Sequence, residues 1–479
     1  MKWITRLIGG LCLFFVSACA LTPRPEASVI ASLPSSTPPL SAPLVSPVKT
    51  PFPQEYGTPP LFTPPPHPSE PTPWPTIQYD LLFKSSIDPN NYKLMRWHHL
   101  TAQNEVLIRD EVEELSSQPG DPAPSRIAQF SLSADNQTLA VVRIRQKPKG
   151  AAFVDEYELA LFDFRSGQLT TLVKLETPVI WSAISPDGQW LAFMSWETPR
   201  TIHVLKTSAP GQALEIGSCD EECWDFVWSP DSRILAWSDS QGVWLSSVDD
   251  AQPRLIASNK SLVLTDGQRA VYAPPPWSPN GHYLLVHSRD IEVGEISIVD
   301  IQTGRLGALP DSHEYPYSNV HTVWLNDGSL FVVRNGDAYV KKSPSYEIWR
   351  VDPKVFSLLI LDKYSDIPVS SLTYPTAPTQ FDDGRLGFVL LALSEANNEE
   401  SGLYTLSPTG QPPRRFSASL PLFDDPGSVY ASWLPDGTGA IIHNETGPIQ
   451  RIYVPANDKM PLTLPDLNFG LTCCFVWLK

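Results

Sequence analysis

Four cysteines form two close pairs in the sequence, and paired thiols can either join as disulfides or hold a metal ion. Cys219 and Cys223 are separated by three residues, and Cys473 and Cys474 are adjacent. A four-thiolate zinc site is the less favoured alternative, because the C-x-x-C spacing usual for structural zinc is absent. We expect no metal or cofactor. In an exported protein Cys219 and Cys223 are the natural local disulfide, and an adjacent-residue disulfide between Cys473 and Cys474 is a second option.

Sequence motifs of the common hydrolases and metalloenzymes are missing. There is no Gly-x-Ser-x-Gly nucleophile elbow, His-Glu-x-x-His zinc motif, EF-hand loop or phosphate-binding glycine loop. His98 and His99 are the only adjacent histidines, and neighbouring residues on a strand point to opposite faces, which favours a surface feature over a metal site. Four acidic residues could serve as catalytic acids, but each lies in a repeated turn that explains it: Asp187, Asp231, Asp327 and Asp436.

That turn recurs along the chain at a regular spacing. The three best copies are Ser185-Pro186-Asp187-Gly188, Ser229-Pro230-Asp231-Ser232 and Ser278-Pro279-Asn280-Gly281. With four weaker copies, the third positions are residues 135, 187, 231, 280, 327, 383 and 436, which stand 44 to 56 residues apart. This spacing is typical of one four-stranded propeller blade per repeat.

The chemistry of the repeat explains why it forms a turn between two strands. Proline presets the backbone of the second position, Asp or Asn accepts hydrogen bonds from the local backbone, and Gly tolerates the left-handed conformation. Short aromatic and β-branched runs flank the turn, such as residues 179–184 before it and 190–194 after it. A third and a fourth strand follow in most repeats. The sequence therefore predicts an all-β fold, a β-propeller of four-stranded blades.

This pattern resembles the TolB-like, WD40-like family of propeller repeats. The signature of that family is a strand, a Trp/Phe-Ser-Pro-Asp-Gly turn and a second strand of the Leu-Ala-Phe type. The resemblance covers residues 78–479, and its best copies are residues 228–237 and 277–286. The copies at 325, 381 and 434 lack the Ser, and the copy at 133 lacks the Pro and the Gly. The resemblance implies a propeller fold, and the departures of these copies affect the number of blades.

The two ends of the propeller are expected to close the ring together. Residues 475–477 repeat the Phe-Val-Trp sequence of residues 226–228, whereas residues 79–84, 92–100 and 105–109 supply three strands without a first strand. Pairing the C-terminal strand with these N-terminal strands leaves no open edge. Eight blades result, with seven as the alternative if the N-terminal strands only extend a neighbouring blade.

The N-terminus carries the features of a bacterial lipoprotein signal, which we assign to residues 1–18. A basic start is followed by an apolar stretch at residues 7–16 that is too short to span a bilayer. Small residues then precede Cys19, as in the lipobox whose cysteine is acylated and becomes the first residue after cleavage. Acyl chains on Cys19 would hold the protein on the outer membrane or on the outer face of the plasma membrane.

Composition separates a spacer from the propeller and excludes some partners. Residues 19–77 are expected to form a disordered linker, because 18 of the 56 residues at positions 22–77 are Pro, interleaved with Ser and Thr. Domain boundaries are therefore expected at 1–18, 19–77 and 78–479. The formal net charge is −17 at pH 7, which disfavours nucleic acid as a partner.

A ligand site, if present, is expected where the first strands of the blades begin, at one mouth of the central channel. The column of residues there is chemically mixed, and its candidate ligand-binding members are Trp181, Trp224, Asp225, His321 and Tyr430. Blade packing is the favoured alternative for these aromatic side chains. The column three positions later is rich in Trp, including Trp228, Trp277 and Trp324, and is expected to pack the core.

These observations favour a membrane-anchored binding module for a protein, a peptide or a glycan of the cell envelope. No catalytic residue is assigned. The competing hypothesis is an extracytoplasmic carbohydrate-active hydrolase or lyase, with Asp225 and His321 as acid–base groups at the channel mouth. A third and weaker hypothesis is an assembly factor for other envelope proteins, which the resemblance to TolB-like proteins implies.

Overall fold

The structure is a computed structural model that describes most residues from Tyr79 to Leu478. The described ranges are 79–88, 91–101, 103–108, 126–149, 152–221, 223, 225–258, 271–273, 277–289, 294–308, 320–334, 345–352, 357–364, 373–392, 395–406, 413–423, 429–444, 451–455, 462–463 and 475–478. The predicted signal and linker of residues 1–77, with Cys19, therefore lie outside the described residues, as do Trp224, Cys473 and Cys474.

The described strands form eight antiparallel sheets of four strands each. The first four sheets in chain order are β1 (Asp80–Asp88), β2 (Asn91–His98) and β3 (Gln103–Ile108) with β32 (Phe475–Leu478); β4 (Arg126–Leu132), β5 (Thr138–Lys149), β6 (Ala152–Asp163) and β7 (Gln168–Leu175); β8 (Val179–Ile184), β9 (Trp190–Ser195), β10 (Arg200–Lys206) and β11 (Ala213–Cys219); and β12 (Phe226–Trp228), β13 (Ile234–Asp239), β14 (Gly242–Ser247) and β15 (Arg254–Ser258).

The other four sheets complete the described elements. They are β16 (Val271–Ala273), β17 (Tyr283–Arg289), β18 (Gly294–Asp300) and β19 (Leu306–Ala308); β20 (Val320–Trp324), β21 (Leu330–Arg334), β22 (Ser345–Asp352) and β23 (Ser357–Tyr364); β24 (Thr373–Gln380), β25 (Leu386–Ala392), β26 (Gly402–Leu406) and β27 (Arg414–Arg415); and β28 (Val429–Trp433), β29 (Gly439–Asn444), β30 (Arg451–Pro455) and β31 (Leu462–Thr463). One 3₁₀ turn, η5 (Glu395–Glu400), precedes β26. Within the described ranges, the structure contains no helix that is long and apolar enough to cross a membrane.

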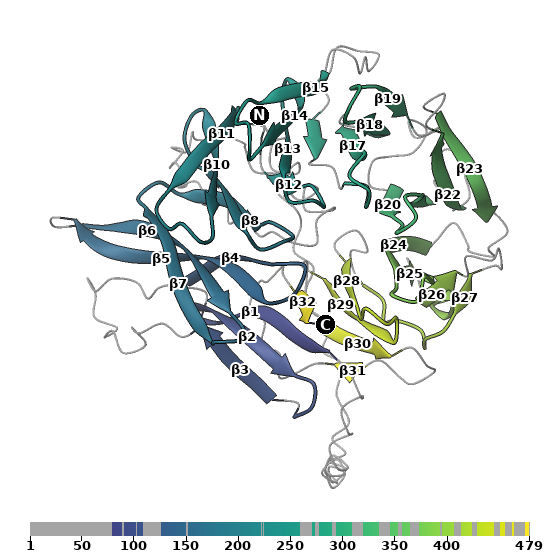
Figure 1. Cartoon of the computed structure of the whole chain (residues 1–479). Helices are drawn as coiled ribbons and strands as arrows, with labels where there is room; N and C mark the ends of the chain where they lie inside the picture. Colours follow the sequence, from purple (N-terminus) through teal and green to yellow (C-terminus); the bar gives the residue numbers. More distant parts are fainter. Residues whose placement is uncertain are drawn as a thin grey trace, which may run out of the picture. The chain divides into compact units, whose positions relative to one another are not determined.

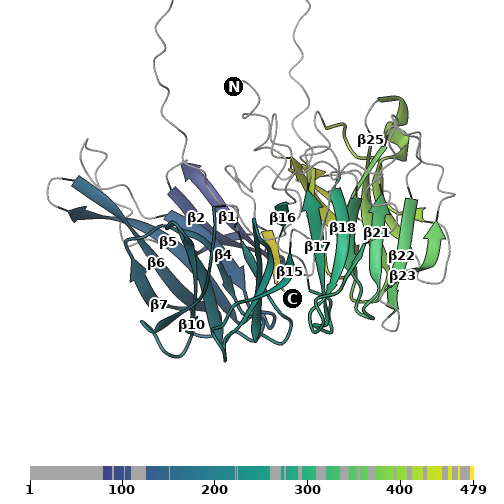
Figure 2. The ribbon, with the colours of Figure 1, turned by 90° about the horizontal axis from the view of Figure 1, so that it is seen from above.

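The sheets are arranged in a ring, and seven of the eight have their first strand in chain order at the centre (Figure 1). Consecutive sheets contact each other through these inner strands, as β4 does with β8 and β20 does with β24. Figure 2 shows the strands from the side, running between the two ends of the ring. The predicted β-propeller of four-stranded blades is therefore confirmed.

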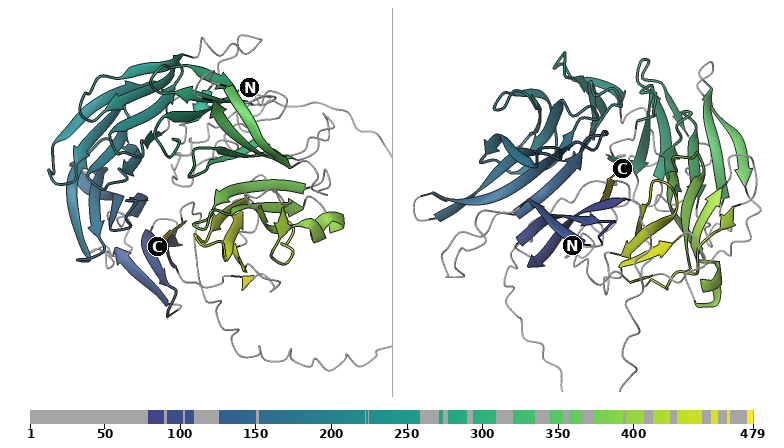
Figure 3. Two further views of the ribbon diagram at one scale, coloured as in Figure 1. Left: turned by 45° about the vertical axis from the view of Figure 1, so that its right-hand side comes forward. Right: turned by 60° about the horizontal axis from the view of Figure 1, so that its bottom comes forward.

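The ring closes through the two termini of the propeller, as the sequence predicted. β32 pairs with β1 in a register from Asp80↔Leu478 to Phe83↔Phe475 and provides the missing inner strand. The C-terminal strand accordingly lies beside the purple β1 strand (Figure 3, left). The indole N–H of Trp477 then donates to the carbonyl oxygen of Ser432 at 3.4 Å and links β32 to the sheet before it. The described sheets number eight, the larger of the two values left open by the sequence.

The same type of hydrogen-bonded turn recurs in successive blades, where it joins the first strand of a blade to the second strand of that blade. In the copy at Ser185-Gly188, the Asp187 carboxylate accepts from the Ser185 hydroxyl at 2.6 Å and from the Gln189 backbone N–H at 3.0 Å. The Ser185 hydroxyl oxygen in turn accepts from the Trp190 backbone N–H at 3.0 Å. Gly188 completes the turn with φ of 72°, in the left-handed region that favours glycine. The repeated Asp is thus fully explained by the turn.

The turns of neighbouring blades also bond to one another. Ser232 replaces the glycine of its own turn with φ of 65°, and its hydroxyl accepts from the Asp187 backbone N–H at 3.0 Å. Similar links join Ala134 N to Pro186 O at 3.0 Å, Asn326 N to Gln380 Oε1 at 2.7 Å, and Asp382 N to Pro435 O at 3.1 Å. We call this end of the ring the turn end, and the opposite end, where the first strands begin, the loop end.

Tryptophans after the inner strands pack the core between blades. Trp228, Trp277 and Trp324 are all buried. Trp228 also donates its indole N–H to the carbonyl oxygen of Ala183, on the preceding inner strand, at 3.0 Å. This hydrogen bond satisfies a polar atom that would otherwise be buried without a partner. The core-packing column predicted from the sequence is present in these three blades.

Removing one turn carboxylate tests the importance of this network. Asp231→Ala removes the acceptor of the Ser229 hydroxyl and of the Arg233 backbone N–H, which lie 2.6 and 3.2 Å from it. We expect the free energy of unfolding to fall by about 1–2 kcal/mol, as for the loss of partly buried hydrogen bonds. Urea unfolding followed by tryptophan fluorescence measures the change. Asp250→Ala, at an exposed turn aspartate, is the matched control, and equal losses in both variants would contradict the network.

Candidate functional site

The residues predicted for the channel mouth lie at the loop end on different inner strands. Trp181 belongs to β8, Asp225 immediately precedes β12, and His321 belongs to β20. Tyr430 lies in β28, where its backbone pairs with that of His443. The structure therefore places these residues at one level of the ring but in four different sheets.

Trp181 holds neighbouring inner strands together. Its side chain is buried, and its indole N–H donates to the carbonyl oxygen of Phe226 on the next inner strand at 3.1 Å. Gln129 acts in the same way one blade earlier, because its amide donates to the carbonyl oxygen of Ile180. These two hydrogen bonds, at the same level of the ring, join neighbouring blades. The contact between blades therefore explains the position of Trp181 without a ligand.

Asp225 and His321 are titratable groups whose charged forms are disfavoured by their surroundings. Burial raises the pKa of the Asp225 carboxyl to about 7 and lowers the pKa of the His321 imidazole to about 4. Burial is the only cause in each case, so neither pKa carries a contribution from the charge of the other group. The sheet β16–β19 lies between their two sheets. The structure does not bring them together as an acid–base pair.

A disulfide joins Cys219 and Cys223 at the loop end. The two Cα atoms are 5.9 Å apart, and the bridge closes a short loop between β11 and β12. Within this loop the Asp220 carboxylate accepts from the Ser240 backbone N–H at 3.2 Å and from the Ser240 hydroxyl. Because Ser240 lies in the turn between β13 and β14, the loop is attached to the blade that follows it.

An exposed tryptophan is linked to this disulfide loop through Arg200. Trp196 follows β9, is 45% exposed, and donates its backbone N–H to the carbonyl oxygen of Pro178 at 2.7 Å. The guanidinium of buried Arg200 lies over the Trp196 ring at 4.9 Å from its centroid and also donates to the carbonyl oxygen of Cys223. We call Pro178, Trp196, Arg200 and the Cys219–Cys223 loop the Trp196 patch.

Sequence reasoning did not single out Trp196 or Arg200. Both lie outside the repeated turn and outside the inner strands, and the contact of Arg200 with Cys223 joins positions 23 residues apart along the chain. The one local signal was a tryptophan directly after a predicted second strand and before a polar, proline-containing loop. Many tryptophans of this chain pack the core, so that signal did not separate an exposed ring from a buried one.

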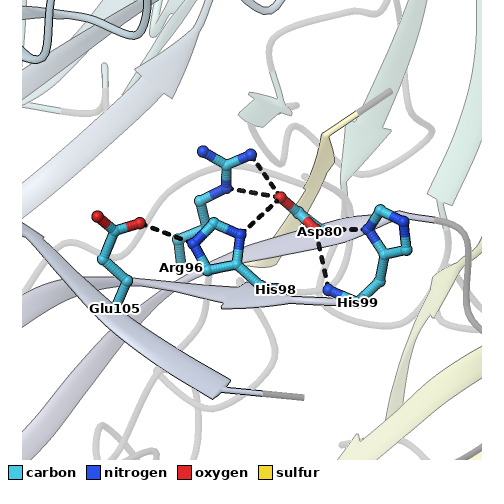
Figure 4. A network of polar contacts seen from close by, with 5 residues as sticks. All are labelled: Asp80, Arg96, His98, His99 and Glu105. Carbon is cyan, nitrogen blue, oxygen red and sulfur yellow. Dashed lines mark hydrogen bonds and ion pairs between the residues drawn. The ribbon is translucent and has the colours of Figure 1, made fainter. Parts of the chain in front are cut away.

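A second polar cluster surrounds Asp80 on the closing sheet (Figure 4). One oxygen of the buried carboxylate bonds the Arg96 guanidinium, with Nε at 2.7 Å, and lies 3.3 Å from Nδ1 of His98. The other oxygen accepts from the His99 backbone N–H at 2.9 Å and lies 2.6 Å from Nδ1 of His99. His98 also pairs with Glu105 at 2.8 Å through Nε2.

The Asp80 cluster corrects the expectation for the two adjacent histidines. β2 ends at His98 and His99 begins a turn, so the strand alternation that would separate the two side chains stops there. Both imidazoles therefore reach the same carboxylate. Over the ranges given above, no group of three or more His, Cys, Asp or Glu side chains is placed to hold a metal ion. The cluster bonds β1, β2 and β3 at the closure of the ring.

Neutralising Asp80 should weaken the closing sheet in a pH-dependent way. Burial alone would raise the pKa of Asp80, but hydrogen bonds from His99 and Arg96 outweigh burial and hold the pKa below its ordinary value of 3.8. The carboxylate therefore stabilises the fold above pH 3.8, and this contribution is lost as the pH falls through the lower pKa of the folded state. We expect Asp80→Asn to lower the Tm at neutral pH, with a difference from wild type that narrows in acid.

Thermal unfolding followed by circular dichroism over a pH series measures this difference. Glu105→Gln is the control, because Glu105 is half-exposed and bonds only His98 among the cluster residues. A constant difference between Asp80→Asn and wild type at every pH would contradict a charge-dependent role.

Asp225 should show the opposite dependence on pH. Between the ordinary pKa of 3.8 and the raised value of about 7, the folded chain keeps a proton that the unfolded chain releases, so stability falls as the pH rises. Asn cannot ionise, and we expect Asp225→Asn to have a higher Tm than wild type at about pH 8 and a similar Tm at about pH 4. Equal Tm values at both pH values would show that the carboxyl ionises normally.

Comparisons with known proteins agree on the fold. The chain is similar to dipeptidyl peptidase 4 from Porphyromonas gingivalis, with 11% identity and a TM-score of 0.51, over 81% of this chain and 58% of that chain. It is also similar to TolB from Acinetobacter baumannii (16% identity, TM-score 0.34, 82% and 81% of the two chains) and to the β-propeller domain of the Trilobed protease from Pyrococcus furiosus (14%, 0.38, 72% and 96%).

These similarities concern the fold and not the chemistry. The chain spans 58% of the peptidase that it matches. No protein-family model matches the sequence, and no curated protein does so. The four-stranded sheets of the ring identify the described part of the chain as a β-propeller, and the similarity to the peptidase concerns that fold alone.

Proposed function

We propose that this protein is a membrane-anchored lipoprotein of the cell envelope whose propeller is a binding module for a partner protein outside the cytoplasm. The proposed location is inferred from the sequence, where a basic start, an apolar stretch and small residues precede Cys19. Acylation of Cys19 would anchor the chain, and the proline-rich residues 19–77 would act as a spacer.

The Trp196 patch is the observation that carries the binding role. An aromatic ring exposed to solvent is a common centre of a protein interface, where Trp and Arg contribute most often. Here the ring is already fixed, because its backbone N–H bonds Pro178 and a buried Arg200 lies over one face. Arg200 itself bonds the disulfide loop at Cys223. Little side-chain entropy would be lost on binding, which favours affinity.

Two observations favour binding over catalysis at the loop end. Asp225 and His321 lie in sheets that are separated by a third sheet, and no described contact joins them. Trp181 uses its polar atom to bond the next blade. The groups that the sequence offered for acid–base chemistry at the channel mouth are therefore explained by burial and packing, whereas the Trp196 side chain is 45% exposed.

Chemical crosslinking in intact cells of the native host tests this function. We expect a reproducible partner protein to crosslink to the full-length chain near the Trp196 patch, and Trp196→Ala to reduce its recovery at least tenfold. This loss corresponds to about 1.4 kcal/mol or more of binding free energy, which a central aromatic residue of an interface commonly supplies.

Leu255→Ala is the matched control. Leu255 is also an exposed large apolar residue, with 38% of its surface accessible against 45% for Trp196, but it lies in β15 and is not part of the Trp196 patch. Circular dichroism of both variants checks that they fold. Recovery that falls equally in both variants, or in neither, would argue against the Trp196 patch as the binding surface.

A further inference from the structure

A small cavity lies at the turn end of the third blade. It has a volume of about 320 Å³ and is lined by Gln189, Trp190, Lys206, Thr207 and Ser208. Gln189 and Trp190 connect the repeated turn to β9, and the other three residues are at the end of β10 and just after it. Trp190 and Lys206 are cross-strand partners at the last register position of these strands.

The backbone around this cavity is fixed. The Thr207 backbone N–H donates to the carbonyl oxygen of Gln189 at 2.9 Å. The Thr207 hydroxyl donates to the carbonyl oxygens of Gly188 and Gln189 at 3.0 and 3.1 Å. Trp190 is half-buried and packs against the hydrophobic core of its blade. The two turns that frame the cavity are therefore held together before any ligand arrives.

The lining presents polar groups that the fold does not use. Among the contacts of the described part of the chain, none involves the Gln189 amide, the Trp190 indole N–H or the Ser208 hydroxyl as donor or acceptor. The Lys206 ammonium is exposed and lies over the Trp190 ring, 5.1 Å from its centroid. The residues that line the cavity thus carry one positive charge and three further donor groups.

This set of groups fits an oxyanion attached to a small ring. The ammonium and the neutral donors match a carboxylate, and a charge-assisted hydrogen bond to Lys206 is the strongest interaction they can make. The half-buried indole of Trp190 adds apolar surface to the lining. The carboxylate of Asp187, the nearest acidic residue in the sequence, is already occupied by the Ser185 hydroxyl and the Gln189 backbone N–H.

From this geometry we propose that the cavity binds a single hexuronic acid unit of a glycan, with its carboxylate on Lys206. A volume of about 320 Å³ corresponds to the space of about ten water molecules, which accommodates one six-membered sugar ring. The net charge of the chain is −17, but the field of distant charges is screened beyond about 8 Å at physiological ionic strength, so the adjacent ammonium dominates.

This site is separate from the Trp196 patch. The strand β9 runs from Trp190 at the turn end to Ser195 at the loop end, and its six residues span about 20 Å. The proposal therefore does not depend on the protein partner proposed above. A negative result in the crosslinking experiment would not decide the binding experiment described below, and the reverse also holds.

Titration of the full-length protein with glucuronate, glucose, acetate and inorganic phosphate tests the proposal. Saturation-transfer NMR or calorimetry gives the Kd of each probe. We expect glucuronate to bind at least tenfold more tightly than the other three probes, because only glucuronate offers both a ring and a carboxylate. Lys206→Met keeps the length of the side chain, removes its charge, and should raise the Kd for glucuronate at least tenfold.

Lys174→Met, at a half-exposed lysine of β7, is the control and should leave the Kd unchanged. Ser208→Ala should raise the Kd two- to fivefold. Acetate or phosphate binding as tightly as glucuronate would overturn the sugar class, and glucose binding as tightly would overturn the role of the carboxylate. Absence of saturable binding, or a Kd unchanged in Lys206→Met, would overturn the site itself.

Discussion

The turn built on a repeated Ser-x-Asp or Ser-x-Asn pair is the interaction on which the rest of this structure depends. In the four turns that carry this pair, the side-chain oxygen of Asp or Asn accepts from the Ser hydroxyl and from a backbone N–H, as Asp231 does from Ser229 and Arg233. The turn fixes where the first strand ends and the second begins, which sets the register of the blade. Because the turns also bond their neighbours, they define the relative position of consecutive blades at one end of the ring.

That arrangement gives the two ends of the propeller different properties. At the turn end, short and regular connections bond their own backbone and that of their neighbours, and side chains such as Gln189 and Ser208 are exposed. At the loop end, the connections between blades and the links from second to third strands vary in length and composition. A disulfide, a buried arginine and an exposed tryptophan are brought together there by contacts across blades. Function in such a fold is expected in the variable connections, which tolerate change without loss of the core.

Burial rather than charge pairing controls the titratable groups nearest the centre of the ring. The shifted pKa values of Asp225 and His321 arise from burial alone. By contrast, Asp80 at the closure is stabilised as a carboxylate by hydrogen bonds from His99 and Arg96, so its pKa falls despite its burial. A shifted pKa beside a channel is therefore a weak guide to catalysis in this protein, because closing a ring of sheets removes water from the inner strands whatever the protein does.

The sequence by itself determined the features that depend on residues close along the chain. The turns involve bonds over two to five positions, such as Ser185 to Asp187 and Trp190 to Ser185, so their residues could be recognised from spacing alone. Closure was also predictable, because the incomplete repeats at the two ends complement each other. Only the tertiary structure decided which side chains meet across blades or lose water. Arg200 contacts Cys223 and Asp80 contacts His99 over separations of 23 and 19 residues, and the depth of Asp225 depends on all the blades around it. These contacts and this burial result from the packing of distant segments, which cannot be inferred from residues that are close along the chain.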